Sequence, residues 1–151
     1  MSEPEHVRET GRWLRFAHDD QRGAEALLER DDVPPRLACF LAQQAAEKSI
    51  KAALIFLQTE FPFRHDLDLL RDLLPDDWAL KETPTGLGAL SAWAARGRYP
   101  GDLPEATRED AKAAIEKARK VYETALADLE EHGYDQTDGE SRAEAGEEET
   151  S

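Results

Sequence analysis

The stretch RLACFLAQQAAEKSIK, residues 36–51, decides the fold, because its apolar residues recur with helical periodicity. Two prolines precede it, at a helix start where their missing amide donors cost little. We therefore predict a helix over residues 34–59. Its buried side is expected to consist of the following apolar residues: Leu37, Phe40, Leu41, Ala45, Leu54 and Leu57.

Polar side chains interrupt this apolar segment in two rows. Gln44 and Lys48 continue the stripe of Leu41, which puts an amide and an amine on the side that we expect to be buried. Gln43, Glu47 and Lys51 follow one another at intervals of four, and the last two form a favourable i,i+4 pair. The segment therefore has two distinct faces.

The rest of the chain also predicts helices, and no segment shows the alternation typical of strands. We expect an all-α, up-and-down bundle of four long helices plus one short helix. Its domain covers residues 1–134, and residues 135–151 form an acidic tail whose composition is typical of disorder. The helices outside 34–59 are predicted at residues 4–30, 67–74 (the short one), 86–97 and 108–132.

Composition limits the classes of partner. A length of 151 residues fits one domain, and the formal net charge is −14. An acidic body disfavours nonspecific binding to DNA or to a membrane surface. The same acidity is also compatible with a high-salt host. No apolar run approaches the roughly 18 residues that a membrane span needs, and the polar N-terminus predicts no signal peptide. Cys39 is the single cysteine, so we expect a reducing, cytoplasmic setting and no cysteine metal site.

Asp20 and Lys48 are the first candidates for a functional pair. Each lies on the apolar stripe of its predicted helix, and a buried lysine is costly unless it is paired. We expect the two side chains to meet across the helices. A register-setting polar pair and a Lys48 that extends to the surface are the structural alternatives to a binding role.

Two further clusters contain groups with useful chemistry. His65 precedes Asp66, so His65 is a candidate general base, or else Asp66 caps the short helix and His65 bonds a neighbouring helix end. Arg96, Arg98 and Tyr99 lie at a helix end, where they suit phosphate binding and base stacking, or compensation of the helix dipole. No cluster has the spacing of a metal site, and no cofactor is predicted.

The order of these segments resembles the HEPN domain, named for higher eukaryotes and prokaryotes nucleotide-binding. The resemblance covers about residues 9–132, and AAEKSIKA within the second helix is its most specific part. The segments that carry it are WLRFAHDDQRGAEALLE (13–29), RLACFLAQQAAEKSIKAALIF (36–56), RHDLDLL (64–70) and ARGRYPGD (95–102).

The resemblance implies a helical homodimer and a frequent partner, a minimal nucleotidyltransferase of the MNT type, in a two-gene toxin–antitoxin system. It also implies that many relatives are metal-independent ribonucleases with an Arg, four to six residues and then a His near the penultimate helix. This sequence departs from that pattern, because the next histidine after Arg98 is His132. Arg12 and His18 match by count, but they lie in the first helix and six helical steps turn them about 240° apart.

Three hypotheses follow. The first is a nucleotide- or partner-binding module, without catalysis, in such a toxin–antitoxin pair; its binding residues would be Lys48, Asp66, Arg96 and Tyr99. The second is a ribonuclease toxin with a non-standard site made of His65 and Arg98. The third is a scaffold or adaptor domain whose acidic tail serves solubility or a basic partner. The missing motif favours the first.

Overall fold

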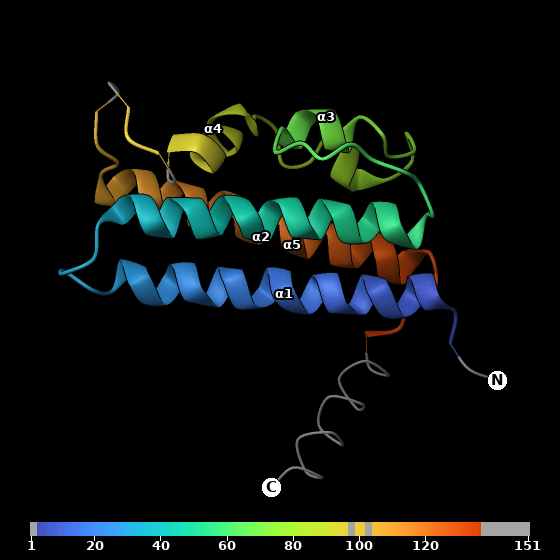
Figure 1. Ribbon diagram of the computed structural model, residues 1–151. Helices are drawn as coiled ribbons and strands as arrows, with labels where there is room; N and C mark the ends of the chain where they lie inside the picture. The colour runs from blue at the N-terminus through green and yellow to red at the C-terminus, as the bar shows by residue number, and fades with distance from the viewer. Residues whose placement is uncertain (1–2, 97–98, 102–103, 137–151) are drawn as a thin grey trace, which may run out of the picture.

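The computed structural model describes residues 3–96, 99–101 and 104–136 of the chain. These residues form helices and no strand, which confirms the all-α class (Figure 1). The helices are α1 (Glu5–Leu28), α2 (Pro35–Phe56), α3 (Leu67–Arg71), α4 (Gly88–Arg96) and α5 (Arg108–Glu131), with a 3-10 turn, η1 (Ala79–Lys81).

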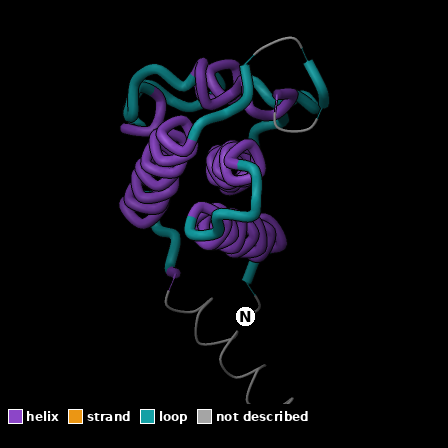
Figure 2. Tube along the Cα trace, turned by 90° about the vertical axis from the view of Figure 1, so that its left-hand side faces the viewer, coloured by secondary structure: helices purple, strands orange, loops and turns teal. Residues whose placement is uncertain are grey.

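The three long helices α1, α2 and α5 pack side by side, and the short elements cover the side of α2 that faces away from α1 (Figures 1 and 2). The chain runs along α1, returns along α2, passes back through α3, η1 and α4, and ends along α5 (Figure 1). The up-and-down order is therefore completed by short helices, and α4 has 9 residues where the sequence predicted a longer helix.

Helix α2 is the centre of the bundle, because it contacts α1, α3, α4 and α5. Small side chains permit this close packing: Leu41 Cδ1 would lie 3.2 Å from a Cβ built on Gly23 of α1, so the two helices approach closely there. The fully buried alanines of α2 are Ala42, Ala45, Ala46, Ala52 and Ala53.

The prediction for the faces of α2 is wrong in part. Leu37 is 36% exposed, and Gln44 and Lys48 are partly exposed rather than buried. The opposite row is more deeply covered, because α3 and the loop before it pack over that side of α2. The row consists of Gln43, Glu47 and Lys51, all of which are buried.

Local helix signals are confirmed at three ends. Asp66 caps α3 by accepting hydrogen bonds from two backbone amides. Thr107 and Asp110 form a reciprocal capping box at the start of α5. Gly133, with φ of 102°, follows α5 in a left-handed conformation that glycine adopts without strain.

Residues 137–151 lie outside the described residues, so the predicted acidic tail stays a prediction. Near the end of the described part, Tyr134 packs against α1, where its hydroxyl lies 3.1 Å from the position that a Cβ on Gly11 would take. None of the helices in the described ranges combines the length and the apolar character needed to cross a membrane.

Candidate functional site

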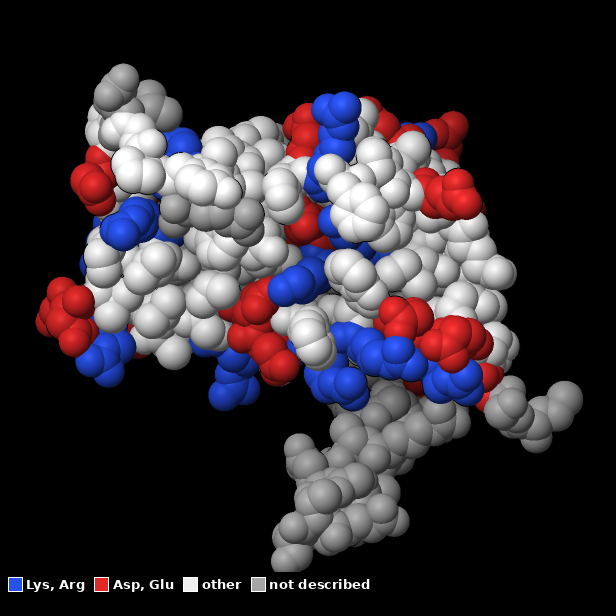
Figure 3. All heavy atoms as spheres, viewed as in Figure 1, with Lys and Arg blue, Asp and Glu red and all other residues white. Residues whose placement is uncertain are grey.

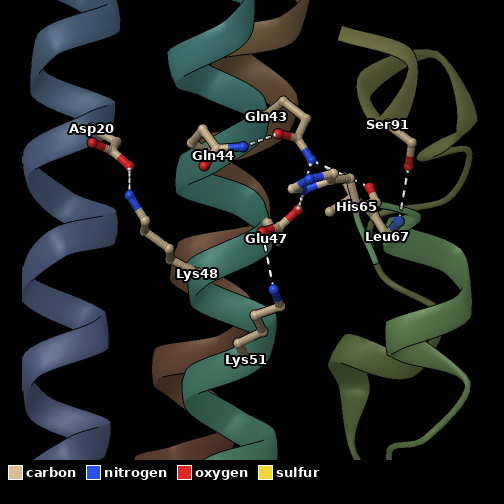
Figure 4. A network of polar contacts seen from close by, with 9 residues as sticks. All are labelled: Asp20, Gln43, Gln44, Glu47, Lys48, Lys51, His65, Leu67 and Ser91. Atoms are coloured by element: carbon tan, nitrogen blue, oxygen red, sulfur yellow. Dashed lines mark hydrogen bonds and ion pairs between the residues drawn. The ribbon is translucent and has the colours of Figure 1, made fainter. Parts of the chain in front are cut away.

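A buried carboxylate on α2 is the centre of the polar network in Figure 4. Glu47 is 6% exposed and accepts three hydrogen bonds. Gln43 Nε2 donates to Glu47 Oε1 at 3.2 Å, Lys51 Nζ donates to Oε2 at 3.1 Å, and His65 Nδ1 lies 2.7 Å from Oε1. The donors come from one turn before Glu47, from one turn after it, and from the loop before α3.

Lys51 supplies the opposite charge that lets Glu47 be buried as a carboxylate. Its side chain is 7% exposed, and its ammonium lies 5.9 Å from the Trp13 ring and 5.5 Å from the Phe61 ring. A buried ion pair is tolerated when its remaining hydrogen-bonding capacity is filled, as Gln43 and His65 do here. The row that the sequence shows at intervals of four is therefore an internal ionic network.

His65 is held by this network but remains accessible. Its side chain is 52% exposed, although its Nδ1 bonds the buried Glu47. Gln43 Nε2 also donates to the His65 carbonyl at 3.3 Å, and the Leu67 amide donates to Ser91 Oγ at 2.9 Å, which ties this loop to α4. Because an ionised carboxylate only accepts, we assign the donated proton to Nδ1, which leaves Nε2 as the ring nitrogen that faces a ligand.

A hollow of about 560 Å³ separates the His65 loop from α4. His65 and Asp66 form one rim, Gly88 and Ser91 lie along α4, and Tyr99 completes the lining with 64% of its surface exposed. Asp66 keeps its capping bonds to α3, so its carboxylate is already engaged. The arrangement offers a proton acceptor and a stacking surface around one volume.

Arg96 is fixed next to this hollow, at the end of α4. Its guanidinium lies 4.4 Å from the centroid of the Trp93 ring, and its Nη2 donates to the Pro104 carbonyl at 3.3 Å. Together with Tyr99 it lines a second hollow of about 340 Å³. Arg98, the other arginine that the sequence singled out, lies outside the described residues.

Lys48 and Asp20 meet across α1 and α2, with Nζ and Oδ2 2.5 Å apart. Figure 4 shows that Lys48 points toward α1, whereas His65 lies on the other side of α2. The structure therefore does not bring Lys48 together with His65 or Tyr99. Lys48 instead lines a separate hollow of about 260 Å³ with Trp13 and Phe16.

Arg12 and His18, the pair that matches the ribonuclease spacing by count, have different neighbours. Arg12 pairs with Glu9 and Glu5 on its own helix, whereas the His18 ring contacts Tyr122 of α5 at 5.9 Å. Figure 3 shows that acidic and basic side chains are interspersed on the side of the molecule that faces the viewer, including the region of α1. The two residues do not form one site.

Neither a metal site nor a reactive thiol stands out in the described ranges. No group of three His, Cys, Asp or Glu side chains there could hold a metal ion. Cys39 is fully buried, and burial raises the pKa of its thiol to about 12. At neutral pH this cysteine is therefore a small apolar side chain of the core.

A family model for the HEPN domain matches residues 10–131. The chain belongs to the HEPN family. Membership supports a nucleotide-binding or ribonuclease-like helical module. Among solved structures, this HEPN chain is similar to TT1696 from Thermus thermophilus, with a TM-score of 0.67 and 28% identity over 80% of this chain and 98% of that one. No curated protein matches it significantly.

Sequence reasoning missed Glu47, the residue that holds His65. The i,i+4 spacing of Gln43, Glu47 and Lys51 is visible in the sequence, but it indicates a row separate from the stripe expected to be buried. The available signal was the row of three polar residues at intervals of four within a helix that is mostly apolar. Arg36 was also missed, because one arginine at a helix start is ordinary in a sequence.

Proposed function

We propose that this HEPN domain binds single-stranded RNA or a nucleotide in the hollow between the His65 loop and α4. The observation that carries the proposal is that the fixed imidazole of His65 and the exposed ring of Tyr99 line the same hollow. An aromatic ring stacks on bases of any sequence, and a histidine donates to or accepts from phosphate and hydroxyl groups. The family membership supports the same class of ligand.

Fluorescence anisotropy with short labelled RNAs tests this function. We expect Tyr99→Ala to weaken binding by about fivefold or more, because stacking of a base on an aromatic ring contributes about 1–3 kcal/mol. Phe16→Ala is the matched control, since Phe16 is also exposed, at 57%, but lies on α1 in the separate hollow. Equal losses in the two variants, or no binding to the wild-type chain, would rule out this site.

A metal-independent endoribonuclease is the second candidate, and the bond between Glu47 and His65 favours it. With Nδ1 held by the carboxylate, Nε2 can accept the proton of a ribose 2′-hydroxyl. The 2′-oxygen then attacks phosphorus and the 5′-oxygen leaves, taking a proton from water. The products are a 2′,3′-cyclic phosphate and a 5′-hydroxyl end.

Incubating the purified chain with RNA in the presence of EDTA tests the ribonuclease. Cleavage that produces cyclic phosphate ends and disappears in His65→Ala, but persists in His18→Ala, would establish it. His18 is the suitable control because it is exposed and belongs to the match with Arg12 by count. An intact RNA would leave the binding module as the function.

The partnership in a two-gene toxin–antitoxin system is also a proposal, and it rests on the family. The partner would be a minimal nucleotidyltransferase, and the HEPN chain would form a homodimer. The hollow beside Phe16 and Lys48 provides a surface for either contact, because its lining includes two aromatic rings, Trp13 and the exposed Phe16. Co-expression with the neighbouring gene followed by mass measurement of the complex tests both. A lone monomer would exclude both.

A further inference from the structure

The second hollow lies where the first turn of α2, the end of α4 and the segment before α5 meet. Its volume of about 340 Å³ is in the range of small-ligand sites, about 300–1,000 Å³. The side chains that matter for its chemistry are Arg36, Trp93, Arg96, Tyr99 and Glu105. The hollow shares Tyr99 with the hollow of His65, so the two volumes adjoin.

Arg96 is held in place on this hollow before any ligand arrives. Trp93 is 6% exposed and packs against the guanidinium, and the Pro104 carbonyl accepts one of its hydrogen bonds. A planar guanidinium in a fixed position loses less entropy when it binds an anion than a mobile lysine would. Its remaining donors are available to a ligand.

Arg36 is the less compensated of the two arginines. It is half-buried, and it makes no ion pair or side-chain hydrogen bond with any residue in the described ranges. It is the second residue of α2, whose N-terminus has no side-chain cap and no acidic residue in its first turn. The positive end of the helix dipole therefore adds to the charge of Arg36.

Acidic groups near the hollow compensate this charge only in part. Glu105 is exposed at its rim. Asp110 lies near Arg96, but its hydrogen bonds with Thr107 are the main reason why the pKa of its carboxyl is lowered, and Arg96 contributes less. Among the described residues that line the hollow, Glu105 is the single acidic one. The two guanidiniums therefore outnumber the acidic side chain among these lining residues, on a chain whose formal net charge is −14.

We propose that this hollow binds the phosphomonoester of a nucleoside 5′-phosphate, supplied either by a free nucleotide or by the 5′ end of an RNA. Arg36 and Arg96 hold the phosphate, because guanidinium donors match phosphate oxygens in geometry and charge. Tyr99 lies at the junction with the first hollow and stacks on the base, and Glu105 accepts from the ribose hydroxyls. The inference rests on the proposed binding of RNA or nucleotide and assigns its phosphate subsite.

Nuclear magnetic resonance titration of the full ¹⁵N-labelled chain tests the subsite with four probes at constant salt. The probes are AMP, adenosine, and a pentanucleotide RNA with either a 5′-phosphate or a 5′-hydroxyl. We expect AMP to shift the Arg36 Nε–H and Trp93 indole signals and to bind at least tenfold more tightly than adenosine. A matching preference between the two RNAs assigns the subsite to RNA ends as well, and its absence assigns it to free nucleotides.

Two variants complete the test. Arg36→Gln should weaken AMP binding at least tenfold and leave adenosine binding unchanged. Arg30→Gln is the control, because Arg30 is an exposed arginine paired with Asp32 shortly before α2. Equal binding of AMP and adenosine, or a phosphate preference that survives in Arg36→Gln, overturns the subsite. The RNA-binding function fails by a different result, namely no shift of His65 or Tyr99 with any probe.

Discussion

Glu47 and His65 are bonded at 2.7 Å, although the first side chain is 6% exposed and the second is 52% exposed. The bond therefore connects the interior of the bundle to the hollow in front of α4. Its buried end is neutralised by Lys51, so the ionic pair and the orientation of the imidazole depend on each other.

Replacing Glu47 by Gln should destabilise the fold by about 3 kcal/mol, because Lys51 then stays buried without a counter-charge. Urea denaturation measures the loss as a lower midpoint at an unchanged slope. The double variant Glu47→Gln/Lys51→Met should recover most of the loss, since an apolar side chain replaces the unpaired ammonium. A single variant as stable as the wild type would show that the pair is not ionic.

The same substitution should change the tautomer of His65. In the wild type, the carboxylate keeps the proton on Nδ1, and long-range ¹H–¹⁵N spectra of the neutral ring should show an unprotonated Nε2. In Glu47→Gln, the amide can donate as well as accept, so both tautomers become populated. The His18 signals, which arise on α1 away from this network, should stay unchanged. A wild-type ring protonated mainly on Nε2 would contradict the assignment.

Asp20 and Lys48 should couple by about 1 kcal/mol in a double-mutant cycle with Asp20→Asn and Lys48→Met. Both side chains are roughly four-fifths covered, which keeps water from screening the pair fully. The exposed pair of Arg30 and Asp32 is the comparison, and its coupling should be close to zero. Because Lys48 lies across α2 from His65, these variants should not change RNA binding in the hollow between the His65 loop and α4 (Figure 4).

The fold was predictable because its signals are local. Helix periodicity, the cap at Asp66 and the capping box of Thr107 and Asp110 each depend on residues within one turn. The buried face of α2 was not predictable in the same way. Helical phase separates two rows of polar residues, but helices pack on both sides of α2, so phase alone does not tell which row is deeper.

The candidate site depends on tertiary contacts that no local pattern contains. His65 is 18 residues beyond Glu47, and the loop between them turns back over α2. Arg36 and Arg96 are far apart in the sequence and share a hollow only because α4 ends beside the first turn of α2. Asp20 and Lys48 could be paired from sequence because both lie on long, regular helices whose apolar stripes must face each other.

Stability should depend on pH through His132 at the end of α5. The pKa of this imidazole is raised, mainly by its hydrogen bond to the Asp128 carbonyl and less by Asp77, and its ring stacks on Trp78 at 4.6 Å. A raised folded-state pKa means that its stabilisation is complete below the unfolded value of about 6.5 and is lost as pH rises through the folded value.

Comparing the wild type with His132→Gln isolates this contribution. The difference in unfolding free energy should be largest near about pH 5.5 and should shrink toward about pH 8. Asp77→Asn should reduce the difference only slightly, because the carbonyl of Asp128 is the main cause of the shift. A difference that grows with pH would mean that the folded state binds the proton less tightly than the unfolded state does.

Cys39 should report global unfolding, because it is the single cysteine and is fully buried in α2. Burial, with a smaller contribution from Asp110, raises the pKa of its thiol to about 12. At about pH 8 only about one thiol in ten thousand would then be ionised in the folded chain. Alkylation by iodoacetamide, followed by mass spectrometry, should therefore proceed only through unfolded molecules. The labelling rate should rise with urea in step with the unfolded fraction and should be higher in Glu47→Gln. Fast labelling of the native wild type would show instead that the packing around Cys39 opens locally, without loss of the fold.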